Sequence, residues 1–204
     1  MADPSGNFPT SRATMKALAF AIGIWLTLDG TGFAQQACSD RSPPSDWLPA
    51  PVTNPEPEDR QAIMDVIHSY AWALDDRNAD ALNELFTDDV VYEACSAGGE
   101  IQMVMTTSLE ELISYLRGQF QDLVNKRFQT RHFESDALLH LRDPDTVEAK
   151  TTLLVSIQRM DDAGIPEFDY TAIRRWTFVR VEGIWRIVKL LLRTDTPEVE
   201  DRGR

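Results

Sequence analysis

The amino-acid sequence predicts an α+β domain at residues 58–193, in which three N-terminal helices pack on a curved, mostly antiparallel sheet and give a cone-shaped fold. Apolar residues recur at helical spacing in the first half of the chain, and β-rich segments alternate with short turn signals in the second half. Helices that precede strands in this way are typical of α+β proteins. Because 43% of the 204 residues are hydrophobic, the chain can form one core, and we expect one domain.

The first helix is predicted at residues 58–76 from an apolar stripe at helical spacing. A second, short helix is predicted at residues 79–86, followed by a short strand at residues 90–92. Ser108, with Glu111 three residues later, forms a capping box that predicts the start of a third helix. The apolar faces of the first and third helices comprise Ile63, Val66, Ile67, Tyr70, Ala71 and Leu74, and Leu109, Leu112, Ile113, Leu116 and Phe120.

Four β-rich segments follow, at residues 128–141, 146–160, 168–180 and 184–193. Short runs rich in Asp, Gly, Glu and Pro separate them, and such runs are turn signals. Short connections predict that consecutive strands pair antiparallel. A strongly curved sheet covered by helices leaves a hollow of the kind that binds small ligands, so we expect a small apolar pocket.

The regions on either side of this domain lack any apolar period. Residues 1–34 are interpreted as an upstream extension and a secretory signal peptide, with positive charge before an apolar stretch at residues 17–28. That stretch is shorter than the ~20 residues that span a membrane, although an uncleaved tethering helix is the alternative. Residues 35–57 are predicted as a flexible linker and residues 194–204 as a disordered tail. We therefore expect a periplasmic or secreted protein.

Two cysteines, Cys38 and Cys95, would remain after cleavage of the predicted signal peptide. An exported protein can form a disulfide, so one bridge between them is conceivable. Cys38 lies in the predicted linker and Cys95 just after a predicted strand, which leaves two independent thiols as an equal alternative.

The charge and the short motifs exclude several classes of function. A formal net charge of −13 opposes nucleic-acid binding, because a phosphate backbone is held by clusters of Lys and Arg. The sequence has no His-x-x-x-His, Cys-x-x-Cys or Gly-rich phosphate motif, which predicts that neither a metal nor another cofactor is bound. The expected partner is a small hydrophobic ligand.

Three stretches of the sequence resemble a known family. These are residues 70–90, with Tyr70-Ala71-Trp72-Ala73-Leu74-Asp75 at their start, Thr130-Arg131-His132-Phe133, and residues 176–186. Together they resemble the SnoaL-like branch of the nuclear transport factor 2-like superfamily, nearest in motif to scytalone dehydratase and bile-acid dehydratase. The resemblance covers about residues 59–193 and implies the cone fold. Domains of this kind often pair through the open sheet face, which implies a homodimer.

The resemblance also implies a catalytic pair. Asp75 falls where the two dehydratase branches hold a catalytic Asp, and His132 falls on their catalytic His. Ile157 stands near the position of the second histidine of scytalone dehydratase, so the resemblance does not imply scytalone as substrate. The catalytic base of ketosteroid isomerases would fall at Ala94, so the resemblance does not imply ketosteroid isomerase activity for this chain.

An imidazole moves protons near neutral pH, and a carboxylate bonded to its other nitrogen fixes the tautomer. Asp75 and His132 could therefore catalyse elimination or isomerisation without a cofactor. For each residue the alternative is a structural role. Asp75 would then be a solvated carboxylate at a helix end, and His132 a core histidine whose hydrogen bonds are satisfied. Tyr70 is a third catalytic candidate, although it lies within the apolar stripe and is more typical of a core aromatic.

Four further residues are predicted to bind the substrate: Tyr92, Trp72, Phe128 and Arg174. Arg174 and Arg175 are neighbours in a predicted strand, so only one of them can face the inside and bind a carboxylate or a carbonyl.

The function predicted from these residues is that of an exported, cofactor-independent dehydratase-type lyase or isomerase acting on a small hydrophobic cyclic substrate. The alternative is a non-catalytic small-molecule-binding or assembly domain of the same fold.

Overall fold

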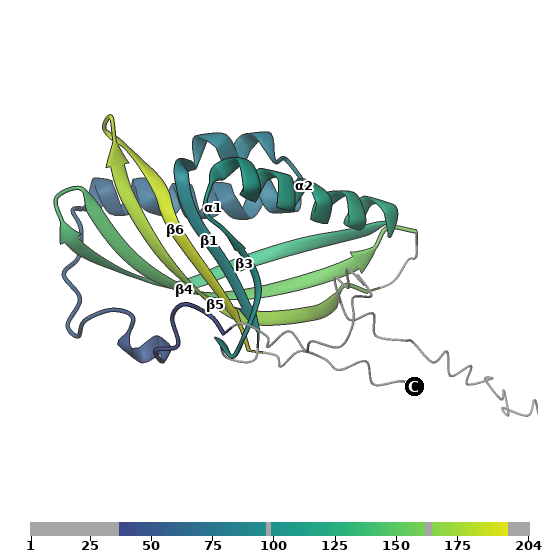
Figure 1. Ribbon diagram of the computed structural model, residues 1–204, viewed down its shortest axis with the longest axis horizontal. Coiled ribbons are helices and arrows are strands. Elements are labelled where there is room, and N and C mark those ends of the chain that lie inside the picture. Colours follow the sequence, from purple (N-terminus) through teal and green to yellow (C-terminus); the bar gives the residue numbers. More distant parts are fainter. Residues whose placement is uncertain (1–36, 97–98, 162–164, 196–204) are drawn as a thin grey trace, which may run out of the picture. The chain divides into compact units, whose positions relative to one another are not determined.

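Two α-helices lie on one side of a six-stranded sheet in the computed structural model, which describes residues 37–96, 99–161 and 165–195 (Figure 1). These residues belong to one unit of the chain, residues 33–198. The predicted signal peptide and nearly all of the predicted tail lie outside the described residues. The elements are η1 (Pro44–Asp46), α1 (Pro57–Asp75), η2 (Asp80–Glu84), β1 (Phe86–Ser96), β2 (Ile101–Thr106), α2 (Leu109–Asn125), β3 (Phe128–Asp143), β4 (Thr146–Arg159), β5 (Glu167–Val181) and β6 (Ile184–Thr194).

The two α-helices begin where the sequence signals predict. Pro57 occupies the first position of α1, where its missing N–H costs no hydrogen bond. At the start of α2, the backbone N–H of Glu111 donates to Ser108 Oγ at 3.3 Å, and the N–H of Thr107 donates to the Glu111 carboxylate at 2.9 Å. Both bonds satisfy N–H groups that the helix itself leaves free.

The prediction of three N-terminal helices is corrected to two α-helices among the described residues. The second predicted helix is the five-residue 3-10 helix η2. It cannot extend to Phe86, because that residue already begins β1 and pairs with Ile187 of β6. The third predicted helix is α2, which follows the hairpin of β1 and β2 instead of preceding the sheet.

The strand order is β2-β1-β6-β5-β4-β3. Strands β3 to β6 form the antiparallel meander that the turn signals predict. The first strand pairs parallel with β6 and antiparallel with β2, so the sheet is mostly antiparallel. The prediction limited β1 to residues 90–92 and missed β2.

The main core fills the space between the helices and the inner face of the sheet. Tyr70 of α1 contacts Phe86 of β1 and Trp176 of β5, with ring centroids 5.6 Å apart and near-perpendicular planes in both pairs. Such edge-to-face contacts are favourable for aromatic rings. The core therefore ties the first helix to the centre of the sheet. None of the helices in the described ranges is both long and apolar enough to traverse a bilayer.

Residues 37–56, which we call the strap, lie against the outer face of the sheet, the face away from α1 and α2 (Figure 1). Cys38 forms a disulfide with Cys95 of β1, with the Cα atoms 6.3 Å apart. Trp47 is only 1% exposed and packs against Cys95 and Leu191. The segment predicted as a flexible linker is thus packed on the domain, although it shows no apolar period.

Candidate active site

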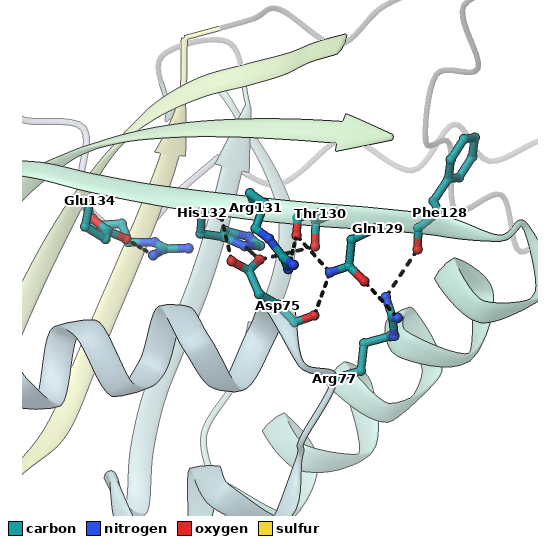
Figure 2. Close-up of polar contacts among 9 residues, drawn as sticks. Asp75, Arg77, Phe128, Gln129, Thr130, Arg131, His132 and Glu134 are labelled. Atoms are coloured by element: carbon teal, nitrogen blue, oxygen red, sulfur yellow. Dashed lines mark hydrogen bonds and ion pairs between the residues drawn. The ribbon is translucent and has the colours of Figure 1, made fainter. Parts of the chain in front are cut away.

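Asp75 and His132 contact each other directly. The Nδ1 atom of His132 lies 2.6 Å from Asp75 Oδ1, and the backbone N–H of His132 donates to Asp75 Oδ2 at 3.1 Å (Figure 2). Thr130 Oγ1 adds a weaker bond to Oδ1 at 3.4 Å. Two contacts from one residue to both carboxylate oxygens fix the relative orientation of the two side chains. The structure therefore brings together the two residues that the resemblance implies.

Local structure explains why this pair forms. Asp75 is the last residue of α1, and His132 lies on the inner-facing side of β3, next to Thr130. Gln129 Nε2 donates to the carbonyl oxygen of Asp75 at 2.8 Å, which ties the helix end to the strand. Arg77, which has a positive φ of 55°, holds Gln129 through a 3.0 Å bond from Nη2 to Oε1 (Figure 2). The chain leaving α1 thus braces the strand that carries the histidine.

Burial sets the protonation state of the imidazole. The side chains of His132 and Asp75 are only 10% and 6% exposed. Burial lowers the pKa of His132 below its ordinary value, the hydrogen bond to Asp75 raises it, and the positive charge of Arg174 lowers it, with a net lowering. The resting ring is therefore neutral near pH 7. With Nδ1–H donated to Asp75, Nε2 carries the free electron pair, and no hydrogen-bond partner for it is found within the described part of the chain.

A second buried pair, Glu134 and Arg174, lies beside the first. Glu134 is two residues after His132 on the same face of β3, and its carboxylate accepts a hydrogen bond from Arg174 Nη1 of β5. Both side chains are 2% exposed. Thr151 Oγ1 donates to the other carboxylate oxygen at 2.7 Å and accepts from Trp176 Nε1 at 3.0 Å. Arg174 Nε is buried and has no partner among the described residues.

The predicted site residues Tyr70 and Tyr92 lie on the inner face near Arg174. The guanidinium carbon of Arg174 is 5.0 Å from the centre of the Tyr70 ring. Burial raises the pKa of Tyr70 and of Tyr92, and the charge of Arg174 opposes this rise for both hydroxyls. Both phenols therefore stay protonated. The Tyr70 hydroxyl hydrogen-bonds to Tyr92 and lowers its pKa, so Tyr70 is the donor in this bond and the Tyr92 hydrogen stays available.

Sequence reasoning missed three residues of this region. Burial raises the pKa of Tyr115 on α2 and of Tyr170 on β5, and both hydroxyls interact electrostatically with Tyr92. The rings of Tyr92 and Tyr115 are 6.3 Å apart. Glu134 was the third. Strand alternation through Thr130 and His132 could have identified it, because residues two apart face the same side of a strand.

Two predicted substrate-binding residues lie away from the pair. Trp72 is 62% exposed, because it sits on the solvent side of α1, between Ala71 and Ala73, which are buried. The ring of Phe128 is turned away from Asp75 and His132 and has the Arg159 guanidinium over it at 5.9 Å (Figure 2). The prediction that these two residues line the site is therefore corrected.

The structure does not confirm the expected apolar pocket. Of the hollows found on the described residues, one lies beside the strap, near Pro44, Ile173 and Arg193. A second lies between the ends of α1 and α2, near Arg77 and Phe120. Neither is lined by Asp75 or His132, so a pocket at the pair stays a prediction.

One group of potential metal ligands occurs in the described ranges. The ligand atoms of Cys38, Glu93 and Cys95 lie within 4.8 Å of one another. The two sulfur atoms are bonded to each other, and the Glu93 carboxylate accepts bonds from Ser39 and Gln102. These atoms are engaged in structural contacts on the outer face, away from the Asp75–His132 pair.

The helices, the curved sheet and the buried Asp75–His132 pair together form an α+β domain. Residues 55–190 match the model of the SnoaL-like domain, and the chain belongs to this family. A comparison with curated proteins gave no match.

Solved structures show the same fold at low sequence identity. A nuclear transport factor 2-like protein with a cystatin-like fold from Novosphingobium aromaticivorans shares 24% identity and a TM-score of 0.56, covering 67% of this chain and 82% of its own. The β subunit of a proposed aromatic-ring-hydroxylating dioxygenase from the same organism has 21% identity and a TM-score of 0.57, with coverage of 71% and 94%. A proposed scytalone dehydratase from that organism has 20% identity and a TM-score of 0.53, with coverage of 67% and 84%.

Proposed function

We propose that the protein is a cofactor-independent lyase of the dehydratase type, or an isomerase, that acts on a small hydrophobic cyclic compound. The observation that carries this proposal is the 2.6 Å contact between Asp75 Oδ1 and His132 Nδ1 in a buried setting. Nε2 of the neutral ring takes a proton from a carbon next to a carbonyl or a leaving group. Asp75 holds the reactive tautomer and stabilises the ring once it is charged.

The neighbouring residues supply hydrogen-bond donors for substrate oxygens. The unpartnered Arg174 Nε and the protonated hydroxyl of Tyr92, which is hydrogen-bonded to Tyr70, can stabilise negative charge that develops on a carbonyl oxygen or a leaving group. The proposal includes export to the periplasm or the exterior, supported by the signal-peptide pattern at residues 1–34. Amino-terminal sequencing of the protein recovered from the periplasm or the medium tests export, and an intact residue 1 would contradict it.

A non-catalytic role is the second candidate. It is supported by the match to the β subunit of a proposed ring-hydroxylating dioxygenase, and the fold itself does not require catalysis. This candidate expects a ligand to be retained without turnover.

The test uses a panel of cyclic β-hydroxyketones and follows loss of water by mass spectrometry. For a substrate that the parent protein converts, His132→Ala and Asp75→Asn should lower kcat/KM about 10²- to 10⁴-fold, the usual contribution of general acid–base catalysis. His68→Ala is the matched control, because His68 is exposed on α1. Parent-level turnover by both folded variants would rule out the base assignment. Binding of panel members without any turnover would favour the non-catalytic candidate.

A further inference from the structure

The strap crosses the outer face of the sheet from one edge toward the other. Near β1 it is held by the Cys38–Cys95 disulfide, and the N–H of Cys38 donates to Gly99 O at 3.3 Å. Ser39 donates through both its N–H, at 2.8 Å, and its hydroxyl to the Glu93 carboxylate, which is fully buried. This end of the strap is therefore fixed by one covalent bond and by several polar contacts.

The middle of the strap contacts the three central strands of the outer face. Asp40 forms an ion pair with Arg175 of β5 at 2.6 Å. Arg193 of β6 donates to Ser42 O at 3.0 Å, and Lys150 of β4 donates to Pro44 O at 3.1 Å. Basic side chains of three neighbouring strands thus point toward the strap and are partly neutralised by it.

Trp47 forms the apolar centre of the contact. Its side chain is 1% exposed and packs with Cys38, Cys95, Leu191 and the half-buried Ile173. Burying an indole of this size removes a large apolar area from water, which makes it the main energetic anchor. Farther along, the N–H of Leu141 on β3 donates to Thr53 O at 2.6 Å, so the strap reaches the opposite edge strand.

Most of the strap, residues 37–54, lies outside the matched family domain, which begins at residue 55. Without the strap, the domain would expose a patch that contains Cys95, Ile173 and Leu191, surrounded by charged side chains. An apolar patch with a polar rim is typical of a protein interface. The rim carries both signs, with Arg175, Lys150 and Arg193 beside Glu93 and Glu148, so the same surface on a second copy can pair with it.

We infer that the strap occupies the surface through which two copies of this chain would otherwise associate. The disulfide-bonded protein is then a monomer, and release of the strap converts it into a dimer through the outer face. The resemblance implies a homodimer through the sheet face. The inference instead expects a monomer while the strap is in place, because the strap and a second copy compete for one surface. The inference stands independently of the proposed enzymatic function.

The experiment measures the mass of the full chain in solution by light scattering and sedimentation velocity over a wide concentration range. The parent protein, with its disulfide intact, should have the mass of one chain. The released variant Cys38→Ser/Cys95→Ser/Trp47→Ala should approach twice that mass as the concentration rises. Trp72→Ala is the matched control, because Trp72 is exposed on the helix side, and it should stay monomeric.

A fourth variant locates the interface. Ile173→Glu, added to the released variant, places a charge at the centre of the uncovered patch and should restore the monomer. If the released variant does not fold, as judged by circular dichroism, Cys38→Ser/Cys95→Ser with Trp47 retained provides the same test, because it still removes the covalent bond that fixes the strap. A dimeric parent protein, a folded released variant that stays monomeric, or a dimer that survives Ile173→Glu would each overturn the inference.

Discussion

Arg174 and Arg175 are adjacent on β5 and lie on opposite faces of the sheet. Arg174 points to the inner face, is 2% exposed and pairs with the equally buried Glu134. Arg175 points to the outer face, keeps 27% of its side chain exposed, and pairs with Asp40 of the strap and with Glu148. The two faces of one strand thus hold the same residue type in very different surroundings.

The comparison shows that the helices on the inner face of the sheet and the strap on the outer face contribute to stability in different ways. Helices within the matched family domain cover the inner face, where polar groups are paired in a water-poor setting and interact strongly. The strap covers the outer face, where ion pairs keep contact with water and are weak. We therefore expect charges to matter most inside, and the covalent bond and Trp47 to matter most outside.

The largest expected effect is that of breaking the inner ion pair. Arg174→Met should lower the free energy of unfolding by about 5 kcal/mol, because it leaves the Glu134 carboxylate buried without its cation. The matched Arg175→Met should cost less than about 1 kcal/mol, since its partners are partly hydrated. Urea unfolding followed by circular dichroism measures both, and equal losses would contradict the distinction between the faces.

Removal of the disulfide should have the next largest effect. The Cys38–Cys95 bond closes a loop with a sequence separation of 57 residues, which includes the strap, α1 and most of β1. Chain-entropy arguments for a loop of this length give a loss of about 4 kcal/mol in the Cys38→Ser/Cys95→Ser variant. The same urea titration checks this value. A loss below about 1 kcal/mol would mean that noncovalent contacts alone hold the strap.

Two adjacent threonines on β4 allow a second comparison of the two faces, with a smaller expected effect on stability. Thr151 is 1% exposed and bonds both Glu134 and Trp176, whereas Thr152 is exposed on the outer face. Thr151→Val should cost about 2 kcal/mol, because it leaves a buried indole N–H without its acceptor. Thr152→Val should change stability by less than about 0.5 kcal/mol. The difference between the two thermal unfolding midpoints measures the asymmetry directly.

The smallest effect is a change in the titration of His132 in the Asp75–His132 pair. Because the folded-state pKa of His132 lies below its ordinary value of 6.5, the unfolded chain binds more protons between these two values. This histidine therefore lowers stability as the pH falls through about 6.5 toward the folded-state pKa, and contributes nothing further below it. NMR titration of the ring should show the lowered pKa. In Asp75→Asn the pKa should fall further, since the carboxylate raises it; a rise would contradict the assigned pairing.

Much of the fold and the Asp75–His132 contact could be predicted because local signals and geometry agree. Turn residues bounded β3 to β6 within one or two positions, and the motif at Asp75 and His132 anticipated a contact between a helix end and a strand. Tyr115 and Tyr170 were missed because their roles depend on which strand or helix faces them, which no local sequence pattern shows. Glu134 was missed although strand alternation with Thr130 and His132 places it on the same face.

The strap could not be predicted for a different reason. It is held by single contacts at Cys38, Asp40 and Trp47, which follow no helical or strand period. Similarly, β2 was missed, although the pair Gly98-Gly99 in the sequence is typical of a turn. A turn at that point implies a returning strand, and residues 101–106 pair with β1 in this way.

The end of α1 at Asp75 also sets the electric field at the imidazole. Aligned peptide dipoles place roughly half a negative elementary charge at the carboxyl end of a helix. The last turn of α1 has no basic residue of its own to cancel this charge. When His132 accepts a proton, the new cation forms beside both a carboxylate and the negative pole of a nineteen-residue helix. The position at which α1 ends thus favours the charged state that turnover would pass through, and a helix ending one turn later would move its negative end away from the ring.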